Sequence, residues 1–293
     1  MRSLAAAAIE TTLRLFALRR FYTDPDLFAW ALDRRQASWQ EPAPPGRRFR
    51  GLPVRRLEHG YQIGDGGRNV LYVHGGGYMR EIDNAQWSFV AKLVRRFGCT
   101  VTVPIYPLVP QASAPQILDL LAAAYATLPE PPVVIGDSAG GNMALGLAQL
   151  LRSRALPRPE RLILLCPHLD CTMSNPAALA LERYDPLVGV YGLAQASRMY
   201  AGPLALDDPL VSPIHADLTG LPPITLYTGT REILYPDCRL FRDRAERAGV
   251  KIDYHELRKM YHVWMMLPVP EAKPVLDHIG ELLGDAFPAA AAR

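Results

Sequence analysis

The sequence Val133-Val134-Ile135-Gly136-Asp137-Ser138-Ala139-Gly140-Gly141-Asn142 decides the fold. A short apolar run leads into Gly-x-Ser-x-Gly, and helix-forming residues follow at once. This order predicts a serine on a sharp strand-to-helix turn. Glycine is favoured on both sides because the turn is so tight that neighbouring side chains would collide. We therefore predict that Ser138 is a nucleophile.

A second glycine-rich motif, His74-Gly75-Gly76-Gly77, follows the apolar run 70–73. Gly-x-Ser-x-Gly alone is weak evidence, because it arises by chance in chains of this length. Three consecutive glycines alone would often be a flexible turn. Here they precede the serine motif in the expected order, and their backbone N–H groups can approach a substrate oxygen. The two motifs together favour an oxyanion-binding loop.

A serine hydroxyl needs a general base to become a good nucleophile at neutral pH. Three of the 7 histidines lie beyond residue 250. His262 follows an apparent strand at 251–256, in a loop where a base is expected. His255 alternates with Ile252 and Tyr254 within that strand, which favours a structural role, and His278 lies in a helical pattern near the end of the sequence. His262 is the predicted base.

Two carboxylates follow the apolar run 223–227 and are candidates for the acid that orients the base. Glu232 comes soon after the strand end, where it can reach the imidazole of a neighbouring loop. Asp237 begins a helical pattern, and an acidic residue there usually interacts with the helix dipole. Position favours Glu232, and Asp237 stays open as the alternative acid.

These motifs resemble the bacterial hormone-sensitive-lipase-like branch of the α/β-hydrolases. The resemblance covers most of the chain and is carried further by three segments in the family's order: Asp208-Pro209-Leu210-Val211-Ser212-Pro213, Gly229-Thr230-Arg231-Glu232-Ile233-Leu234 and Tyr261-His262-Val263. It implies an α/β-hydrolase fold, with a mostly parallel eight-stranded sheet flanked by helices and a helical cap. Within the family, the chain is most similar to small-ester hydrolases such as acetyl esterases.

The resemblance also implies roles for single residues. Ser138 would be the nucleophile and His262 the base, and the N–H groups of Gly76, Gly77 and Ala139 would form the oxyanion hole. The acid departs from the family, which usually has Asp where this chain has Glu232. The expected activity is hydrolysis of short-chain acyl esters through an acyl-enzyme, with a small-molecule ester as partner and with no metal or cofactor.

Composition is consistent with one compact enzyme. The chain has 293 residues, of which 49% are apolar, enough to bury a single core over residues 1–293. The 32 basic and 29 acidic residues are scattered, which is not the pattern of a nucleic-acid groove. The four cysteines lack the spacing of a zinc site or a disulfide framework, so we expect reduced thiols in a cytoplasmic protein; they are Cys99, Cys166, Cys171 and Cys238.

Alternating patterns predict the positions of the main elements. Strands are expected at 70–73, 101–104, 133–136, 162–166, 224–228 and 251–256, after two antiparallel strands. Helices are expected near 85–97, 114–127, 139–154, 236–248 and 270–283. The segments 1–45 and 170–208 are predicted to form the cap. No apolar stretch approaches the roughly 20 residues needed to span a bilayer, and the N-terminal apolar run is too short for a signal peptide.

Several alternatives stay open at this stage. Amidase, lactonase or acyltransferase activity would use the same nucleophile and oxyanion hole. A non-catalytic binding protein with this fold would be expected to have replaced Ser138 or His262, and both are present. The family often pairs through its last strand, here Lys251 to Glu256, so the resemblance also implies a homodimer.

Overall fold

One eight-stranded sheet organises the protein. The computed structural model describes residues 2–16, 19–37, 42–46 and 49–284. Its strand order is β1-β2-β4-β3-β5-β6-β7-β8, in which β2 is antiparallel to both of its neighbours, β1 and β4, and all other neighbouring strands are parallel. The strands are β1 (Val54–Leu57), β2 (Gly60–Ile63), β3 (Asn69–Val73), β4 (Thr100–Pro104), β5 (Val133–Asp137), β6 (Arg161–Leu165), β7 (Ile224–Gly229) and β8 (Ile252–Leu257).

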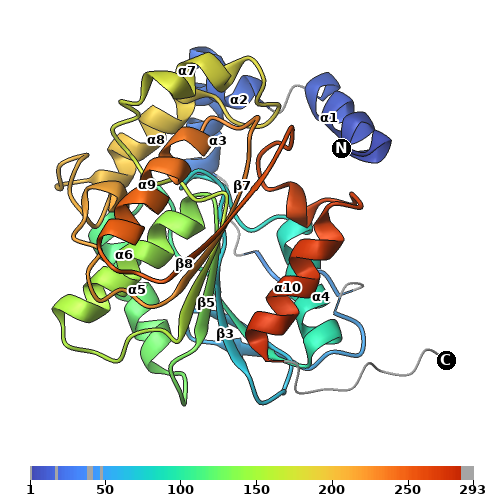
Figure 1. Cartoon of the computed structure of the whole chain (residues 1–293), viewed down its shortest axis with the longest axis vertical. Helices are drawn as coiled ribbons and strands as arrows, with labels where there is room; N and C mark the ends of the chain where they lie inside the picture. The colour runs from blue at the N-terminus through green and yellow to red at the C-terminus, as the bar shows by residue number, and fades with distance from the viewer. Residues whose placement is uncertain (1, 17–18, 38–41, 47–48, 285–293) are drawn as a thin grey trace.

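Helices cover both faces of the sheet and one of its ends. Figure 1 shows α5, α6 and α9 on one face, α4 and α10 on the other, and α2, α3, α7 and α8 gathered at one end. The helices are α1 (Leu4–Leu15), α2 (Arg20–Thr23), α3 (Pro25–Ala37), α4 (Asn84–Phe97), α5 (Ala114–Ala126), α6 (Ala139–Ser153), α7 (Pro176–Glu182), α8 (Val190–Ala201), α9 (Tyr235–Arg247) and α10 (Ala272–Leu283). None of the helices in the described ranges is both long and apolar enough to cross a bilayer.

The predicted fold is confirmed. Each expected strand and helix is present with small differences at its ends, and the two strands before residue 70 are antiparallel as expected. The helical N-terminal region consists of α1, α2 and α3. Part of the predicted cap segment 1–45, namely residues 1, 17–18 and 38–41, lies outside the described residues.

Two apolar layers form the core, one on each face of the sheet. The layer under α5, α6 and α9 includes Leu118 and Phe241, and the layer under α4 and α10 includes Phe89 and Ile279. The inner parallel strands β4, β5 and β7 are buried on both faces, which explains why their sequences are mostly apolar without alternation, whereas β8 at the edge is partly exposed.

Local sequence signals define the ends of α4 and place it beside the site. Asp83 accepts hydrogen bonds from the N–H groups of Ala85 and Gln86, and the Gln86 side chain accepts one from the N–H of Asp83. This capping box satisfies N–H groups that the first turn leaves unpaired. Gly98, in the left-handed conformation with φ of 60°, ends the helix.

The N-terminal segment packs against the insertion that follows β6. Tyr22 of α2 is buried against α8, and a Cβ atom on Gly192 would lie only 2.7 Å from Tyr22 Cα. Only glycine allows the two backbones to approach this closely. The two segments predicted to form the cap are therefore in direct contact, although about 170 residues separate them in the sequence.

Candidate active site

Ser138 lies on the sharp turn between β5 and α6. Its backbone has φ of 53° and ψ of −120°, a conformation that L-residues rarely adopt. The turn is possible because glycines flank it: a Cβ atom on Gly140 would lie 2.0 Å from the carbonyl oxygen of Val73, and one on Gly136 would lie 2.4 Å from that of Gly140. This strained backbone is the one expected for a nucleophile on a tight strand-to-helix turn, and Ser138 is largely buried at the base of a pocket.

His262 and Glu232 lie beside Ser138 and contact each other. The Nε2 atom of His262 is 2.9 Å from the Oγ atom of Ser138, and its Nδ1 atom forms a short hydrogen bond with Oε2 of Glu232. Both side chains are buried. The three residues come from the loops after β8, β7 and β5, so the carboxyl ends of three parallel strands bring them together.

The longer glutamate side chain fits because it turns back toward the end of its own strand. Oε1 of Glu232 accepts hydrogen bonds from the Thr228 hydroxyl at 2.6 Å and from the N–H of Gly229 at 2.9 Å. Oε2 is then directed at His262. The extra methylene thus lets one carboxylate contact both the strand end and the imidazole, and three donors fix its orientation.

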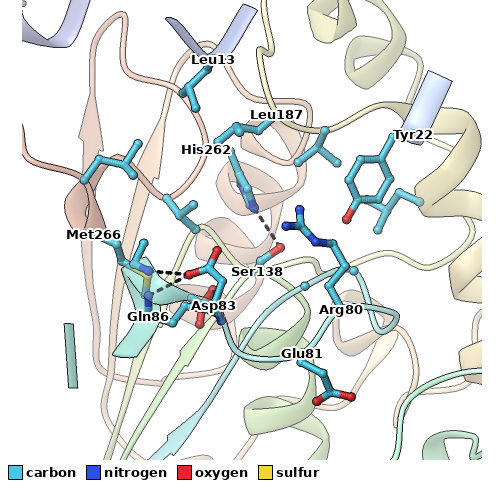
Figure 2. Close-up of a pocket in the computed structure, with 18 residues that line it drawn as sticks. Leu13, Tyr22, Arg80, Glu81, Asp83, Gln86, Ser138, Leu187, His262 and Met266 are labelled. Atoms are coloured by element: carbon cyan, nitrogen blue, oxygen red, sulfur yellow. Dashed lines mark hydrogen bonds between the residues drawn. The ribbon is translucent and has the colours of Figure 1, made fainter. Parts of the chain in front are cut away.

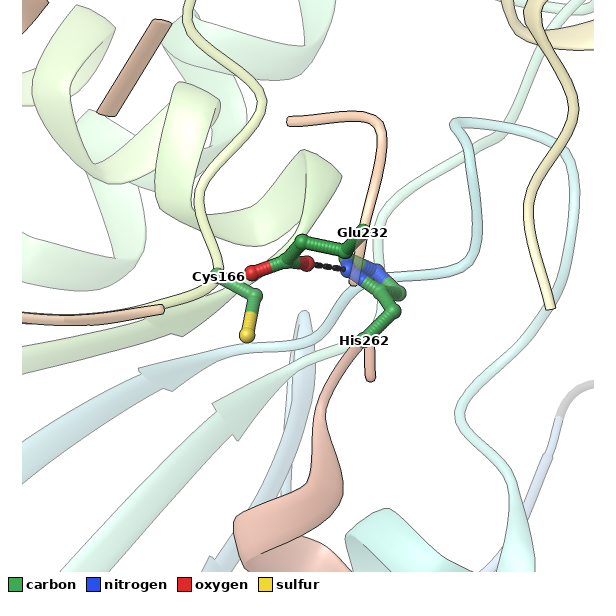
Figure 3. A group of neighbouring side chains, drawn as sticks. All are labelled: Cys166, Glu232 and His262. Carbon is green, nitrogen blue, oxygen red and sulfur yellow. Dashed lines mark hydrogen bonds and ion pairs between the residues drawn. The ribbon is translucent and has the colours of Figure 1, made fainter. Parts of the chain in front are cut away.

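The Cys166 thiol lies next to this pair (Figure 3). Its Sγ atom accepts a hydrogen bond from the N–H of Val263 at 3.3 Å. The ligand atoms of Cys166, Glu232 and His262 all lie within 4.8 Å of one another, so the set has the composition of a thiophilic metal site. A metal ion there would coordinate the imidazole of His262, the same ring that contacts Ser138.

Burial and pairing act in opposite directions on the two ionisable groups. Burial lowers the pKa of His262, but the hydrogen bond and the negative charge of Glu232 outweigh this, and the pKa of His262 is raised. Burial alone would raise the pKa of Glu232, but the charge and hydrogen bond of His262 lower it. The arrangement therefore favours an ionised Glu232 that stabilises the protonated form of His262.

The three N–H groups predicted as oxyanion donors lie near Ser138. Gly76 and Gly77 line the same pocket as Ser138, and both have positive φ, 128° and 59°. Ala139 is the first residue of α6, so its N–H has no acceptor within the helix and can donate to a substrate oxygen. Within the described ranges, the backbone N–H groups of Gly76, Gly77 and Ala139 donate to no other backbone group.

Asp137 fixes the glycine-rich loop beside the nucleophile, and the sequence analysis missed it. Its Oδ1 accepts hydrogen bonds from the Tyr72 hydroxyl at 2.6 Å and from the N–H of Gly75 at 2.9 Å, and its Oδ2 accepts one from Gln86 Nε2 at 2.9 Å. Burial raises its pKa to about 6, although these three donors oppose the rise. Its position directly before Ser138 was the available signal.

Asp185 connects the segment 170–208, predicted to be part of the cap, to the loop that carries Glu232, and it was also missed. This buried carboxylate accepts hydrogen bonds from the N–H groups of Leu187 at 2.9 Å and Val188 at 3.0 Å, both in that segment. Its other oxygen accepts one from the N–H of Ile233 at 3.0 Å. Because Ile233 directly follows Glu232, the segment 170–208 and the loop that carries Glu232 are held together at this point.

The structure does not bring the alternative acid, Asp237, to the histidine. Asp237 lies in the first turn of α9, as the helical pattern predicted, and its Oδ1 accepts a hydrogen bond from Asn175 at 2.7 Å. Burial raises its pKa to about 6. Among the residues that the structure describes, the carboxylate that contacts His262 Nδ1 belongs to Glu232.

A pocket of about 180 Å³ opens over Ser138 and His262. Figure 2 shows that Tyr22 and Arg80 project toward Ser138 on one side, with Leu13 and Leu187 on the other. The two segments predicted to form the cap supply part of the wall, through Leu13, Tyr22, Leu187, Val188 and Leu193. Residues of both segments therefore line the same pocket as the serine.

Comparisons with known proteins agree with this geometry. A family model described as the α/β-hydrolase fold matches residues 70–266, which include the serine, acid and histidine described above. An esterase from Acinetobacter venetianus is 31% identical over 221 residues, covering 72% of this chain and 73% of that protein. An acetyl-hydrolase from Streptomyces hygroscopicus is 30% identical over 228 residues, covering 75% and 76%.

Structural similarity extends over nearly the whole chain. The crystal structure of a hormone-sensitive lipase from a metagenome library has a TM-score of 0.77 and 25% sequence identity, and covers 96% of this chain and 99% of that one. The family model, the two relatives and this structure point to the same family. The chain therefore belongs to the α/β-hydrolases, in the hormone-sensitive-lipase-like branch that its glycine-rich motifs predicted.

Proposed function

We propose that this carboxylic ester hydrolase cleaves short-chain acyl esters, with Ser138 as nucleophile, His262 as general base and Glu232 as the orienting acid. One observation carries the proposal: an unbroken series of contacts runs from Ser138 Oγ through both ring nitrogens of His262 to Glu232, beside a pocket. The acetyl-hydrolase among the relatives supports a small acyl group.

The mechanism follows from these contacts. His262 Nε2 takes the Ser138 proton as Oγ attacks the ester carbonyl, and Glu232 holds the imidazole in the tautomer that leaves Nε2 free to accept. The N–H groups of Gly76, Gly77 and Ala139 stabilise the negative oxygen of the tetrahedral intermediate. His262 then protonates the leaving alcohol. A water molecule, activated by the same imidazole, releases the acid and regenerates Ser138.

We further propose that the segments 1–45 and 170–208 form a cap that limits acyl length. The pocket over Ser138 is small, at about 180 Å³, compared with roughly 300–1,000 Å³ for typical ligand sites. Its cap side is lined by bulky side chains, including Tyr22 and Leu187. A long acyl chain would have to displace them.

Hydrolysis of p-nitrophenyl acetate, butyrate and laurate tests this limit. We expect kcat/KM for acetate or butyrate to exceed that for laurate by at least about tenfold, since each misfitting methylene weakens transition-state binding. The esters are compared below their critical micelle concentrations, so that aggregation does not mimic selectivity. Equal or faster turnover of laurate, or rapid turnover of long-chain triglyceride emulsions, would contradict the proposal.

The pH profile should report the ionisation of His262. Only the neutral imidazole accepts a proton, and pairing with Glu232 raises its pKa. We therefore expect kcat/KM to fall on acidification, with a midpoint above the ordinary histidine value of about 6.5. Replacing Glu232 with glutamine should lower that midpoint in whatever activity remains. A rate that is constant between about pH 5 and 8 would exclude His262 as the base.

A further inference from the structure

A second group of titratable side chains lies away from Ser138, between the last strand and the last helix. Asp253 and His255 lie on β8 and His278 lies on α10, and each is partly buried. One ligand atom from each of the three lies within 4.8 Å of the others. The mechanism proposed above uses none of them.

The backbone explains why these side chains meet. Asp253 and His255 are two residues apart on a strand, so they project from the same face of the sheet. His278 reaches this face from α10, where its Nδ1 atom is 2.7 Å from the Tyr227 hydroxyl of the adjacent strand β7. The Tyr227 ring also stacks on His255, with a centroid separation of 4.9 Å.

The distances suit a bound cation. His255 Nε2 is 2.9 Å from one oxygen of Asp253, and His278 Nε2 is 3.5 Å from the other. Ligands of a tetrahedral zinc ion with bonds of about 2.0–2.1 Å lie about 3.3 Å apart. His255 Nε2 is a buried atom that makes no hydrogen bond within the described part of the chain, despite its short distance to Asp253. A cation would give this nitrogen a partner.

Tyr227 completes the pattern of a metal site. When the N–H at His278 Nδ1 donates a hydrogen bond to the Tyr227 hydroxyl, Nε2 presents a lone pair to the cluster. Metal-binding histidines are commonly oriented by such a second hydrogen bond. Burial, together with the charges of Asp253 and Glu281, raises the pKa of Tyr227, so its hydroxyl keeps its proton near pH 7.

We propose that Asp253, His255 and His278 bind a divalent transition-metal ion of the zinc class, which links β8 to α10. Two imidazoles and one carboxylate form a ligand set that suits zinc, nickel and cobalt better than magnesium or calcium. Water would fill the remaining positions, because all three side chains are partly exposed. The ion stabilises the packing of the edge strand β8 against α10 and takes no part in ester hydrolysis.

Zinc binding to the full-length protein, freed of any affinity tag and treated with a chelator, tests this site. Titration calorimetry with zinc chloride should show one equivalent of zinc bound by Asp253, His255 and His278 more tightly than any other. Zinc should also raise the thermal unfolding midpoint of the protein. His255→Gln and His278→Gln should each weaken this binding more than tenfold. Tyr227→Phe, which keeps all three ligands, should weaken it about 10- to 100-fold.

His59→Gln is the matched control. His59 also lies beside a carboxylate, with Nε2 3.7 Å from Glu58, but this pair belongs to neither three-ligand group found among the described residues. Its replacement should leave zinc affinity unchanged. Esterase activity is measured in the same samples, because zinc on Cys166, Glu232 and His262 would inhibit it.

Three results would overturn the proposal. The first is that the wild type binds no zinc up to millimolar concentration. The second is that both histidine variants keep the zinc affinity of the wild type. The third is that zinc binding always coincides with loss of esterase activity. The binding and melting measurements do not require turnover. An inactive enzyme that still bound zinc through His255 and His278 would therefore contradict the proposed function and leave the metal site standing.

Discussion

Replacing Ser138 with alanine should reduce kcat for p-nitrophenyl butyrate by roughly 10⁴- to 10⁶-fold, the range expected when the nucleophile of such a triad is removed. The serine forms the acyl-enzyme, and its Oγ atom lies 2.9 Å from the nitrogen that accepts its proton. Alanine leaves the pocket and the oxyanion donors in place. Only the slow background that they support should remain.

Folding of the variant needs a matched control, because Ser138 lies in a strained turn. Ser153, the last residue of the same helix, is exposed and donates a hydrogen bond to the carbonyl of Leu150. Ser153→Ala should keep wild-type turnover. Circular dichroism and thermal melting should be close to wild type for both variants. A folded Ser138→Ala protein that kept more than about a tenth of its activity would refute the assignment of the nucleophile.

Much of the architecture could be predicted because its signals are local. The apolar runs that form β3, β5 and β7, and the last strand β8, each lead into a loop or turn that carries a proposed site residue. The order of these loops along the chain, together with Gly-x-Ser-x-Gly, was enough to single out Ser138 and His262. Parallel strands place their carboxyl ends at one edge, so the sequence order alone indicated that the loops would meet.

The supporting contacts could not be predicted because they join residues that are far apart in the sequence. Asp137 holds Gly75 across 62 positions, and Asp185 holds the N–H of Ile233 across 48. An aspartate in a loop carries no sign of its distant partner. The proposed metal site shows the same limit, since the sequence analysis gave His255 a structural role and placed His278 in a helix without bringing the two together.

Assembly and location remain predictions. β8 lies at the edge of the sheet, so the pairing through Lys251 to Glu256 that the family resemblance implies has a strand at which it could occur. Sedimentation showing only monomer at micromolar concentration would remove this prediction. The cytoplasmic location and the absence of a nucleic-acid partner likewise rest on composition and charge distribution.

The choice between the two carboxylates gives the second large effect. Glu232→Gln should lower kcat by roughly 10³- to 10⁴-fold, because the amide can donate to His262 Nδ1 and so favour the tautomer whose Nε2 already carries a proton. The glutamine oxygen can still accept the hydrogen bonds from Thr228 and Gly229, so the loop should keep its shape. The loss should therefore appear in kcat and in the pH midpoint and not in the thermal unfolding midpoint.

Asp237→Asn is the matched variant, since it removes one negative charge and keeps the side-chain shape. Asp237 lies only five residues after Glu232 in the sequence. Its partner is Asn175 and not the histidine, so kcat should change by less than about tenfold. Burial raises the pKa of Asp237 to about 6, which means that ionisation near pH 7 opposes folding. The asparagine variant should therefore lose no stability at that pH. If instead Asp237→Asn lost the larger share of turnover, the acid would be Asp237 and the contact between Glu232 and His262 would not be the catalytic one.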